Sequence, residues 1–178
     1  MRKTLIRVAT LMVLAGCARA QGPHHLHECH QMKTDGLASP DRELVALVFT
    51  SKDNESRIQI CSKAGASLRV IDFLSDDHSH GYGVDGAQWT ANAQFFVFRL
   101  RSSGGHSPIN APVVFWKRKG NRFYHLDGYT GDTTFALSPP DKVSVDTFPA
   151  MKAATLSLHL LQPHEVSEMG RHEAESIR

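Results

Sequence analysis

The feature that most constrains the fold is an internal repeat. Residues 39–72 and residues 90–127 align as two copies of one unit, a turn followed by three strands. The first strands align at an offset of 51 residues, and the hairpins after them align at an offset of 55. The difference of four residues falls in the loop around residues 104–112 of the second copy. Because both alignments occur in the same order and at nearly the same offset, they predict that the chain contains the same structural unit twice.

The residue pattern inside each unit is typical of strands. Residues 44–49 form an unbroken apolar run, which suits a strand that is covered on both faces. Residues 57–61 and 68–71 alternate polar and apolar side chains about Gly65, as a hairpin with one solvated face does. A fainter third copy begins at Ser138 and lacks a hairpin centred on glycine. We therefore predict an all-β fold.

The turn that opens the first unit carries a family resemblance. Ser39-Pro40-Asp41 before an apolar strand and a glycine-turned hairpin resembles a blade of the TolB-type β-propellers, which are extracytoplasmic proteins of the bacterial envelope. The second unit has Trp89 and replaces the turn with Thr90-Ala91-Asn92-Ala93. A closed propeller needs at least about four blades of about 40 residues each. We therefore expect the two blade-like antiparallel units to pack as a small sandwich or half-propeller.

These patterns divide the chain into four parts. Residues 1–20 are predicted to be a signal peptide, and residues 21–38 a polar, histidine-rich arm. Residues 39–161 are expected to form a single β-domain, whose C-terminal strands cover a sheet edge that would otherwise be exposed. Residues 162–178 carry charge and few apolar side chains, and we expect a frayed tail or a short helix there.

The N-terminal segment predicts export. It has a basic start, an apolar run over residues 8–15 and then small residues, which is the build of a signal peptide. Leu14-Ala15-Gly16-Cys17 resembles the lipobox of bacterial lipoproteins, in which Cys17 would be acylated. Ala18-Arg19-Ala20 also fits an ordinary cleavage site. We favour the lipobox, because it is complete and lies where the apolar run ends. The protein would then be periplasmic or anchored at the outer membrane; the alternative is a soluble exported protein.

Either cleavage leaves two cysteines, Cys29 and Cys61. In an oxidising compartment an even pair indicates one disulfide. Closing a loop of about 30 residues would contribute about 3–4 kcal/mol in the chain-entropy model. The alternative is two independent buried thiols.

The charge balance excludes one class of partner. Three of the 20 Lys and Arg residues lie within residues 1–16, which leaves 17 against 18 Asp and Glu. A nearly neutral chain lacks the excess of positive charge with which proteins bind nucleic acid. No stretch after residue 20 approaches the roughly 18 apolar residues that span a bilayer. Contact with the membrane is therefore expected only through the lipid anchor.

Histidines provide the candidate metal ligands. One cluster is His24-His25-Leu26-His27-Glu28-Cys29-His30, which we interpret as a solvated arm, with zinc or copper binding as the alternative. In the other cluster, His78 and His80 would point to one face of a strand-like segment, as metal ligands do. His106 could add a third nitrogen and Asp76 or Asp77 an oxygen. The alternative is a hydrated loop in which the carboxylates balance the histidines.

No catalytic set can be assigned. Ser102, Ser103 and Ser107 lie near His106, but there is no G-x-S-x-G elbow and no orienting acid. The aromatic side chains are interpreted as core, with a ligand groove as the alternative; they are Trp89, Phe95, Phe96, Phe98, Phe115, Trp116, Phe123 and Tyr124. We therefore expect a non-catalytic interaction or accessory module of the cell envelope, with an unknown envelope protein as partner. The competing hypothesis is a zinc- or copper-binding protein or metal-dependent enzyme that uses the histidines.

Overall fold

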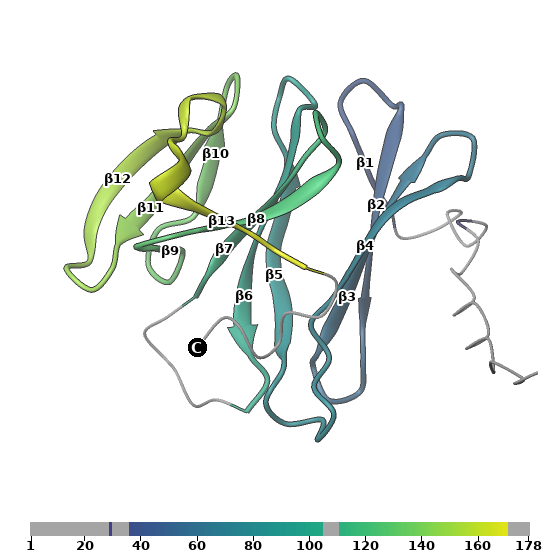
Figure 1. Cartoon of the computed structure of the whole chain (residues 1–178), viewed down its shortest axis with the longest axis horizontal. Coiled ribbons are helices and arrows are strands. Elements are labelled where there is room, and N and C mark those ends of the chain that lie inside the picture. Colours follow the sequence, from purple (N-terminus) through teal and green to yellow (C-terminus); the bar gives the residue numbers. More distant parts are fainter. Residues whose placement is uncertain (1–28, 30–35, 105–110, 171–178) are drawn as a thin grey trace, which may run out of the picture.

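The structure, a computed structural model, describes residue 29 and residues 36–104 and 111–170. The prediction of an all-β fold is confirmed. Three antiparallel sheets lie side by side in chain order (Figure 1). Among the described residues, no helix is long and apolar enough to cross a membrane.

The first two sheets correspond to the two predicted units. The first sheet has the strands β1 (Leu37–Ala38), β2 (Leu44–Thr50), β3 (Ser56–Ser62) and β4 (Ser67–Asp72), in that spatial order. The second has β5 (Tyr82–Trp89), β6 (Phe95–Ser102), β7 (Val113–Lys117) and β8 (Arg122–Leu126), followed at the edge by β13 (Val166–Glu168). β2, β3 and β4 therefore correspond to β6, β7 and β8.

The faint third copy also forms a sheet. It consists of β10 (Ala136–Ser138), β11 (Lys142–Thr147) and β12 (Lys152–Ser157), and the short β9 (Tyr129–Thr130) pairs with β11. The chain then continues through two single-turn 3₁₀ helices, η2 (Leu158–Leu160) and η3 (Pro163–Glu165). β11 and β12 match the first two strands of the repeat unit. The third strand of the unit has no counterpart here among the described residues.

The hydrogen bonds of the two opening turns support the repeat. Ser39 Oγ accepts a bond from the Leu44 amide at 3.0 Å, and Thr90 Oγ1 accepts one from the Phe95 amide at 3.1 Å. The fourth residue of each turn has a left-handed backbone, with φ of 59° and 56°. A threonine turn without proline thus adopts the geometry of the Ser-Pro-Asp turn, because the hydroxyl supplies the same acceptor.

Two apolar cores lie between the sheets. Phe96 and Phe98 of β6 are fully buried in the core against the first sheet. Phe95 and Val97 of the same strand are buried in the core against the third sheet. Both faces of the second sheet are therefore covered, which explains its long apolar runs. The expectation that the aromatic side chains are core residues is confirmed for these strands; Trp89 and Tyr124 are only partly buried.

The structure differs from the predicted segments in three places. Leu37 and Ala38 belong to the sheet, as β1, rather than to the polar arm. Residues 82–89 form a strand, β5, which lies outside the two repeat units predicted from the sequence. The apolar alternation is broken because the strand contains a bulge, where Gly86 has a φ of 66°. Residues 162–170 contain a short helix, η3, as one of the two expectations for this segment had it, and also the unexpected strand β13, which pairs with β8 and covers that edge.

Candidate functional site

Three loops meet at one end of the first two sheets. They are the β2–β3 turn (residues 51–55), the β4–β5 loop (residues 73–81) and the start of the β6–β7 loop at Ser103. Figure 1 shows the first two at the lower end of the sheets. The β4–β5 loop at this end contains four of the predicted metal ligands, which are Asp76, Asp77, His78 and His80.

Glu55 joins the three loops. Its side chain is completely buried, with an exposed fraction of 0%. One carboxylate oxygen accepts bonds from Ser75 Oγ at 2.6 Å, the Gly81 amide at 2.8 Å and Ser103 Oγ at 3.0 Å. The other accepts a bond from the Ser75 amide at 2.8 Å. Each loop therefore has its conformation fixed by one carboxylate.

The hydrogen bonds determine the charge of Glu55. Burial acts to raise the pKa of its carboxyl group, since it penalises the charged form. The bonds donated by Ser75, Gly81 and Ser103 act in the opposite direction, and the net effect is a lowered pKa. Glu55 is thus a buried carboxylate whose charge is compensated by neutral donors. The donors come from the β4–β5 and β6–β7 loops, so the carboxylate holds these loops against the β2–β3 turn.

Two glycines allow the loops to approach this closely. A Cβ atom on Gly81 would lie 2.4 Å from the Phe73 carbonyl oxygen and 2.5 Å from Glu55 Cδ. A Cβ on Gly83 would lie 2.4 Å from the Asn54 carbonyl oxygen. The Gly81-Tyr82-Gly83 sequence is therefore a signal for close backbone packing.

The predicted metal ligands do not lie in a strand. His78 has a left-handed backbone with φ of 58°, within a loop of turns and bends. The premise that His78 and His80 alternate onto one strand face is therefore wrong. His80 Nδ1 pairs with the Asp77 carboxylate. His78 Nδ1 lies 3.8 Å from a carboxylate oxygen of Asp53.

Asp77 organises the loop in the manner of an Asx turn. One of its oxygens accepts bonds from the Ser79 amide and from Ser75 Oγ, both at 3.0 Å. The hydrogen bond with His80 is the largest cause of the lowered pKa of this carboxyl group. Asp76 is exposed. The pairing of carboxylates with histidines matches the hydrated-loop alternative.

The part of the chain that the structure describes brings together no group of three or more histidine, cysteine or acidic side chains able to hold a metal ion. His106, Ser107, the histidines of residues 24–30 and the lipidation candidate Cys17 lie outside the described residues. Ser103 donates to Glu55 and to the Gly81 carbonyl oxygen, at 3.0 and 3.1 Å. Its hydroxyl therefore has a structural role.

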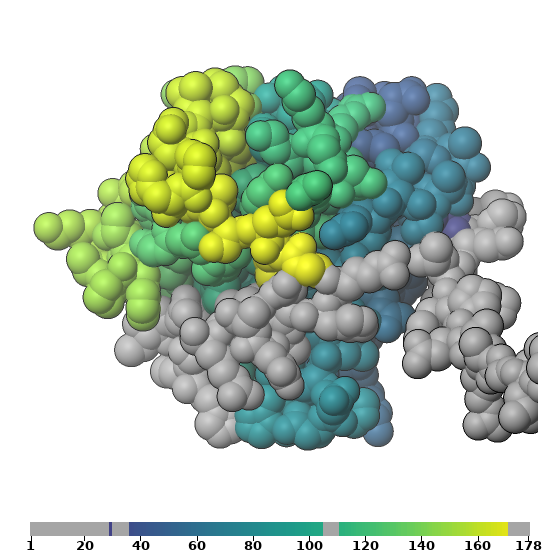
Figure 2. All heavy atoms as spheres, in the orientation of Figure 1, coloured from purple at the N-terminus to yellow at the C-terminus, as the bar shows by residue number. Residues whose placement is uncertain are grey.

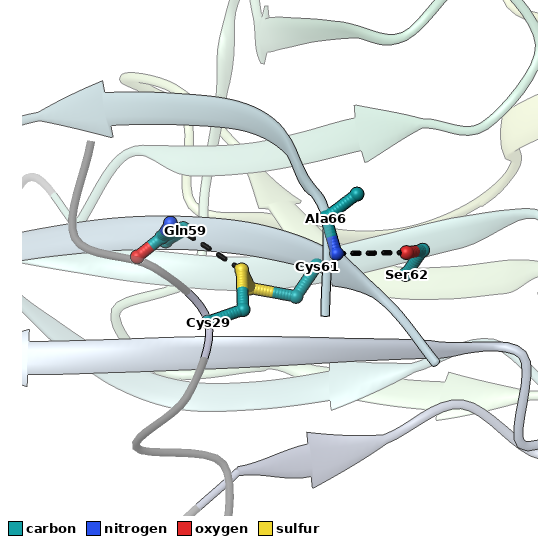
Figure 3. Close-up of a disulfide and its surroundings, with 5 residues drawn as sticks. All are labelled: Cys29, Gln59, Cys61, Ser62 and Ala66. Atoms are coloured by element: carbon teal, nitrogen blue, oxygen red, sulfur yellow. Dashed lines mark hydrogen bonds between the residues drawn. A yellow bond between two sulfur atoms is a disulfide. The ribbon is translucent and has the colours of Figure 1, made fainter. Parts of the chain in front are cut away.

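The predicted disulfide is confirmed. Cys29 is bonded to Cys61 of β3, with 6.2 Å between their Cα atoms (Figure 3). Both cysteines are buried, in a small cluster with Leu47 on the face of the first sheet away from the second. Gln59 Nε2 approaches Cys29 Sγ at 3.4 Å. Because the two sulfur atoms are joined in a disulfide, neither is a thiolate that could ligate a metal ion.

The opposite end of the sheets contains polar links between the repeats. Asp41 of the first opening turn pairs with Arg118 of the second sheet. The hydrogen bond from Ser39 and then that from Arg118 lower the pKa of the Asp41 carboxyl group to about 2. Asn92, at the equivalent position of the second turn, donates to Asp141 of the third at 3.0 Å. The third residue of the opening turn thus links the first sheet to the second through Asp41, and the second sheet to the third through Asn92.

No protein-family model matches the chain, and a comparison with curated proteins finds no similar sequence.

Proposed function

We propose that the protein is a non-catalytic interaction or accessory module of the bacterial cell envelope, exported and anchored to a membrane by a lipid on Cys17. The observation that carries the proposal is the Cys29–Cys61 disulfide. Disulfides of this kind form and persist in oxidising compartments such as the bacterial periplasm. Both cysteines are buried against the first sheet, in a cluster with Leu47, so the bond is a structural one.

The bonding of the loop end supports a scaffold role. Glu55, Ser103 and Asp77 are the residue types that catalytic sites use, and each is engaged in holding a loop. A catalytic acid or base needs a proton position that is accessible to a substrate. Here the donors and acceptors satisfy one another. The consequence is a stiff set of loops that presents a surface of defined shape.

The repeat supports a relationship to TolB-type propellers as part of the same proposal. An opening turn with the same hydroxyl-accepted hydrogen bond, the strand after it and the glycine-turned hairpin recur in the first two sheets, although only the first turn has the Ser-Pro-Asp sequence. Functional residues lie disproportionately on loops that a rigid scaffold positions, and no catalytic set is assigned on the loops described above. Binding of a protein partner in the envelope is accordingly the expected activity.

The compartment and the anchor can be tested together. In a bacterial host, the full chain should fractionate with membranes and incorporate labelled fatty acid. Cys17→Ser should move it to the soluble exported fraction while leaving the Cys29–Cys61 bond intact, as read by alkylation of free thiols. Ala18→Ser is the matched control, because it alters the neighbouring residue and keeps the lipobox. Unchanged membrane association of Cys17→Ser would refute the anchor.

A further inference from the structure

The third sheet lacks the last strand of the repeat unit. In the first sheet β3 is followed by β4, and in the second β7 is followed by β8, each paired as a neighbour. β12 is the counterpart of β3 and β7, and it is the terminal strand of its sheet. After β12 the chain turns through η2 and η3, and β13 pairs with β8 of the second sheet. Among the described strands, none occupies the position beside β12 that corresponds to β4 and β8.

β12 also lacks the features by which edge strands resist pairing. Such features are short length, bulges, proline and charges within the strand. β12 has six residues, pairs with β11 in an unbroken register, and carries a charge only at its first residue, Lys152. The other described edges differ, since β1 has two residues, β10 and β13 have three each, and β5 contains a bulge. β4 carries Arg69 and Asp72.

Exposed apolar side chains lie on both sides of β12 in the sequence. Phe148, in the turn before it, is 42% exposed, and Leu160, in η2 after it, is 62% exposed. These are the two most exposed of the large apolar side chains in the described part of the chain. Figure 1 shows β12 as the outermost strand of the third sheet, and Figure 2 shows light-green atoms of this sheet projecting at that side of the molecule, below yellow atoms from later in the chain. Within the described part of the chain, the edge is therefore unpaired by any strand and has an exposed apolar residue near each end.

We propose that this edge pairs with the same edge of a second copy of the chain, so that β12 pairs antiparallel with β12 across a two-fold axis. This inference deepens the proposed function, on which it rests, by naming the first partner of the interaction module. The free amide and carbonyl groups of the edge would be satisfied by those of the second copy. Two three-stranded sheets would join into one continuous sheet.

The sequence around β12 is complementary to itself in this arrangement. In an antiparallel pair related by a two-fold axis, one residue must lie opposite its own copy. If this residue is Ala154, Lys152 lies opposite Leu156 of the second copy, and the two lysines stay apart. The same register brings the end that carries Phe148 next to the end that carries Leu160 of the second copy. The two exposed apolar residues would thus cover each other.

The test uses charge on the exposed face of β12. Ala153 and Thr155 are both exposed, and in the proposed register each lies opposite the other across the axis. In sedimentation equilibrium, the full chain should shift between one and two chains as its concentration rises. A153K/T155K should weaken the dimer by about tenfold or more, because it places lysines opposite lysines. A136K/S138K is the matched control: it adds the same charge to exposed residues of β10 in the same sheet and should leave the dimer unchanged.

A mixing experiment tests the register. The A153E/T155E variant should also dissociate, whereas an equimolar mixture of the lysine and glutamate variants should form a heterodimer. A monomeric wild-type chain at all concentrations, or a mixture that stays monomeric, would overturn the inference. Neither result affects the thiol and fatty-acid assays above, so failure of the dimer and failure of the proposed function can be told apart. Equal weakening by A136K/S138K would assign dimerisation to another surface and would also overturn it.

Discussion

Replacement of Glu55 by glutamine tests the account of the loop end most fully. Glutamine keeps the size of the side chain and one carbonyl oxygen. It replaces the oxygen that accepts from the Ser75 amide with an NH₂ group, so two donors face each other. One charge-assisted hydrogen bond is lost and a donor is left unpaired, in a side chain with no exposure. We expect a loss of about 2–4 kcal/mol in the free energy of unfolding.

The pH dependence of this loss has a defined sign. The pKa of Glu55 is lowered in the folded protein from an ordinary value of 4.5. The charge of Glu55 therefore adds stability that is fully present above pH 4.5 and is lost as the pH falls through the folded-state pKa. The difference between wild type and E55Q should accordingly be largest near neutral pH and shrink below pH 4.5.

Urea unfolding at a series of pH values, with the disulfide intact, measures both effects. Glu43→Gln is the control, because Glu43 is exposed and forms only a surface pair with Lys63 at 3.6 Å. Its effect should stay within about 1 kcal/mol. An E55Q protein as stable as wild type, or a difference that does not change with pH, would refute the reasoning about Glu55.

Three further predictions concern other parts of the fold. C29S/C61S should lower the free energy of unfolding by about 3–4 kcal/mol, because the closed loop spans 32 positions. Urea unfolding of the reduced wild-type chain should show the same decrease, and a much smaller decrease would contradict the stabilising role of the disulfide. Gly81→Ala should lower the free energy of unfolding by about 1–3 kcal/mol or more, because the added methyl group would overlap Glu55. A melting temperature equal to that of wild type would show that the loop can accommodate the methyl group. Phe98→Ala should cost about 3–5 kcal/mol, measured by urea unfolding, whereas a loss below about 1 kcal/mol would place Phe98 outside the core.

The repeat made much of the fold predictable from the sequence. Two local patterns predicted β2–β4 and β6–β8. They are the alternation of polar and apolar residues on either side of Gly65 and Gly120, and the apolar runs that precede each hairpin. β13 could not be predicted in this way, because residues 166–168 have no apolar periodicity. It forms a strand because the edge of β8 lies beside it, which is a property of the assembled fold.

The candidate site was less predictable, for a physical reason. The sequence shows which residue types are present, and His78, His80, Asp76 and Asp77 were selected on that basis. It does not show that Glu55 is buried, since its burial depends on contacts with residues 20 to 48 positions away. The useful signal was the pair Gly81 and Gly83, whose missing side chains permit those contacts.

We propose that the mature protein is an exported, disulfide-bonded and lipid-anchored domain. Intact-mass spectrometry of the chain recovered from bacterial membranes tests it most directly. The account predicts a mature chain that begins at an acylated Cys17, with two mass units missing for the Cys29–Cys61 bond. A chain that begins at Gln21 without a lipid would contradict the anchor. A chain that begins at Met1 with both thiols free would contradict export itself.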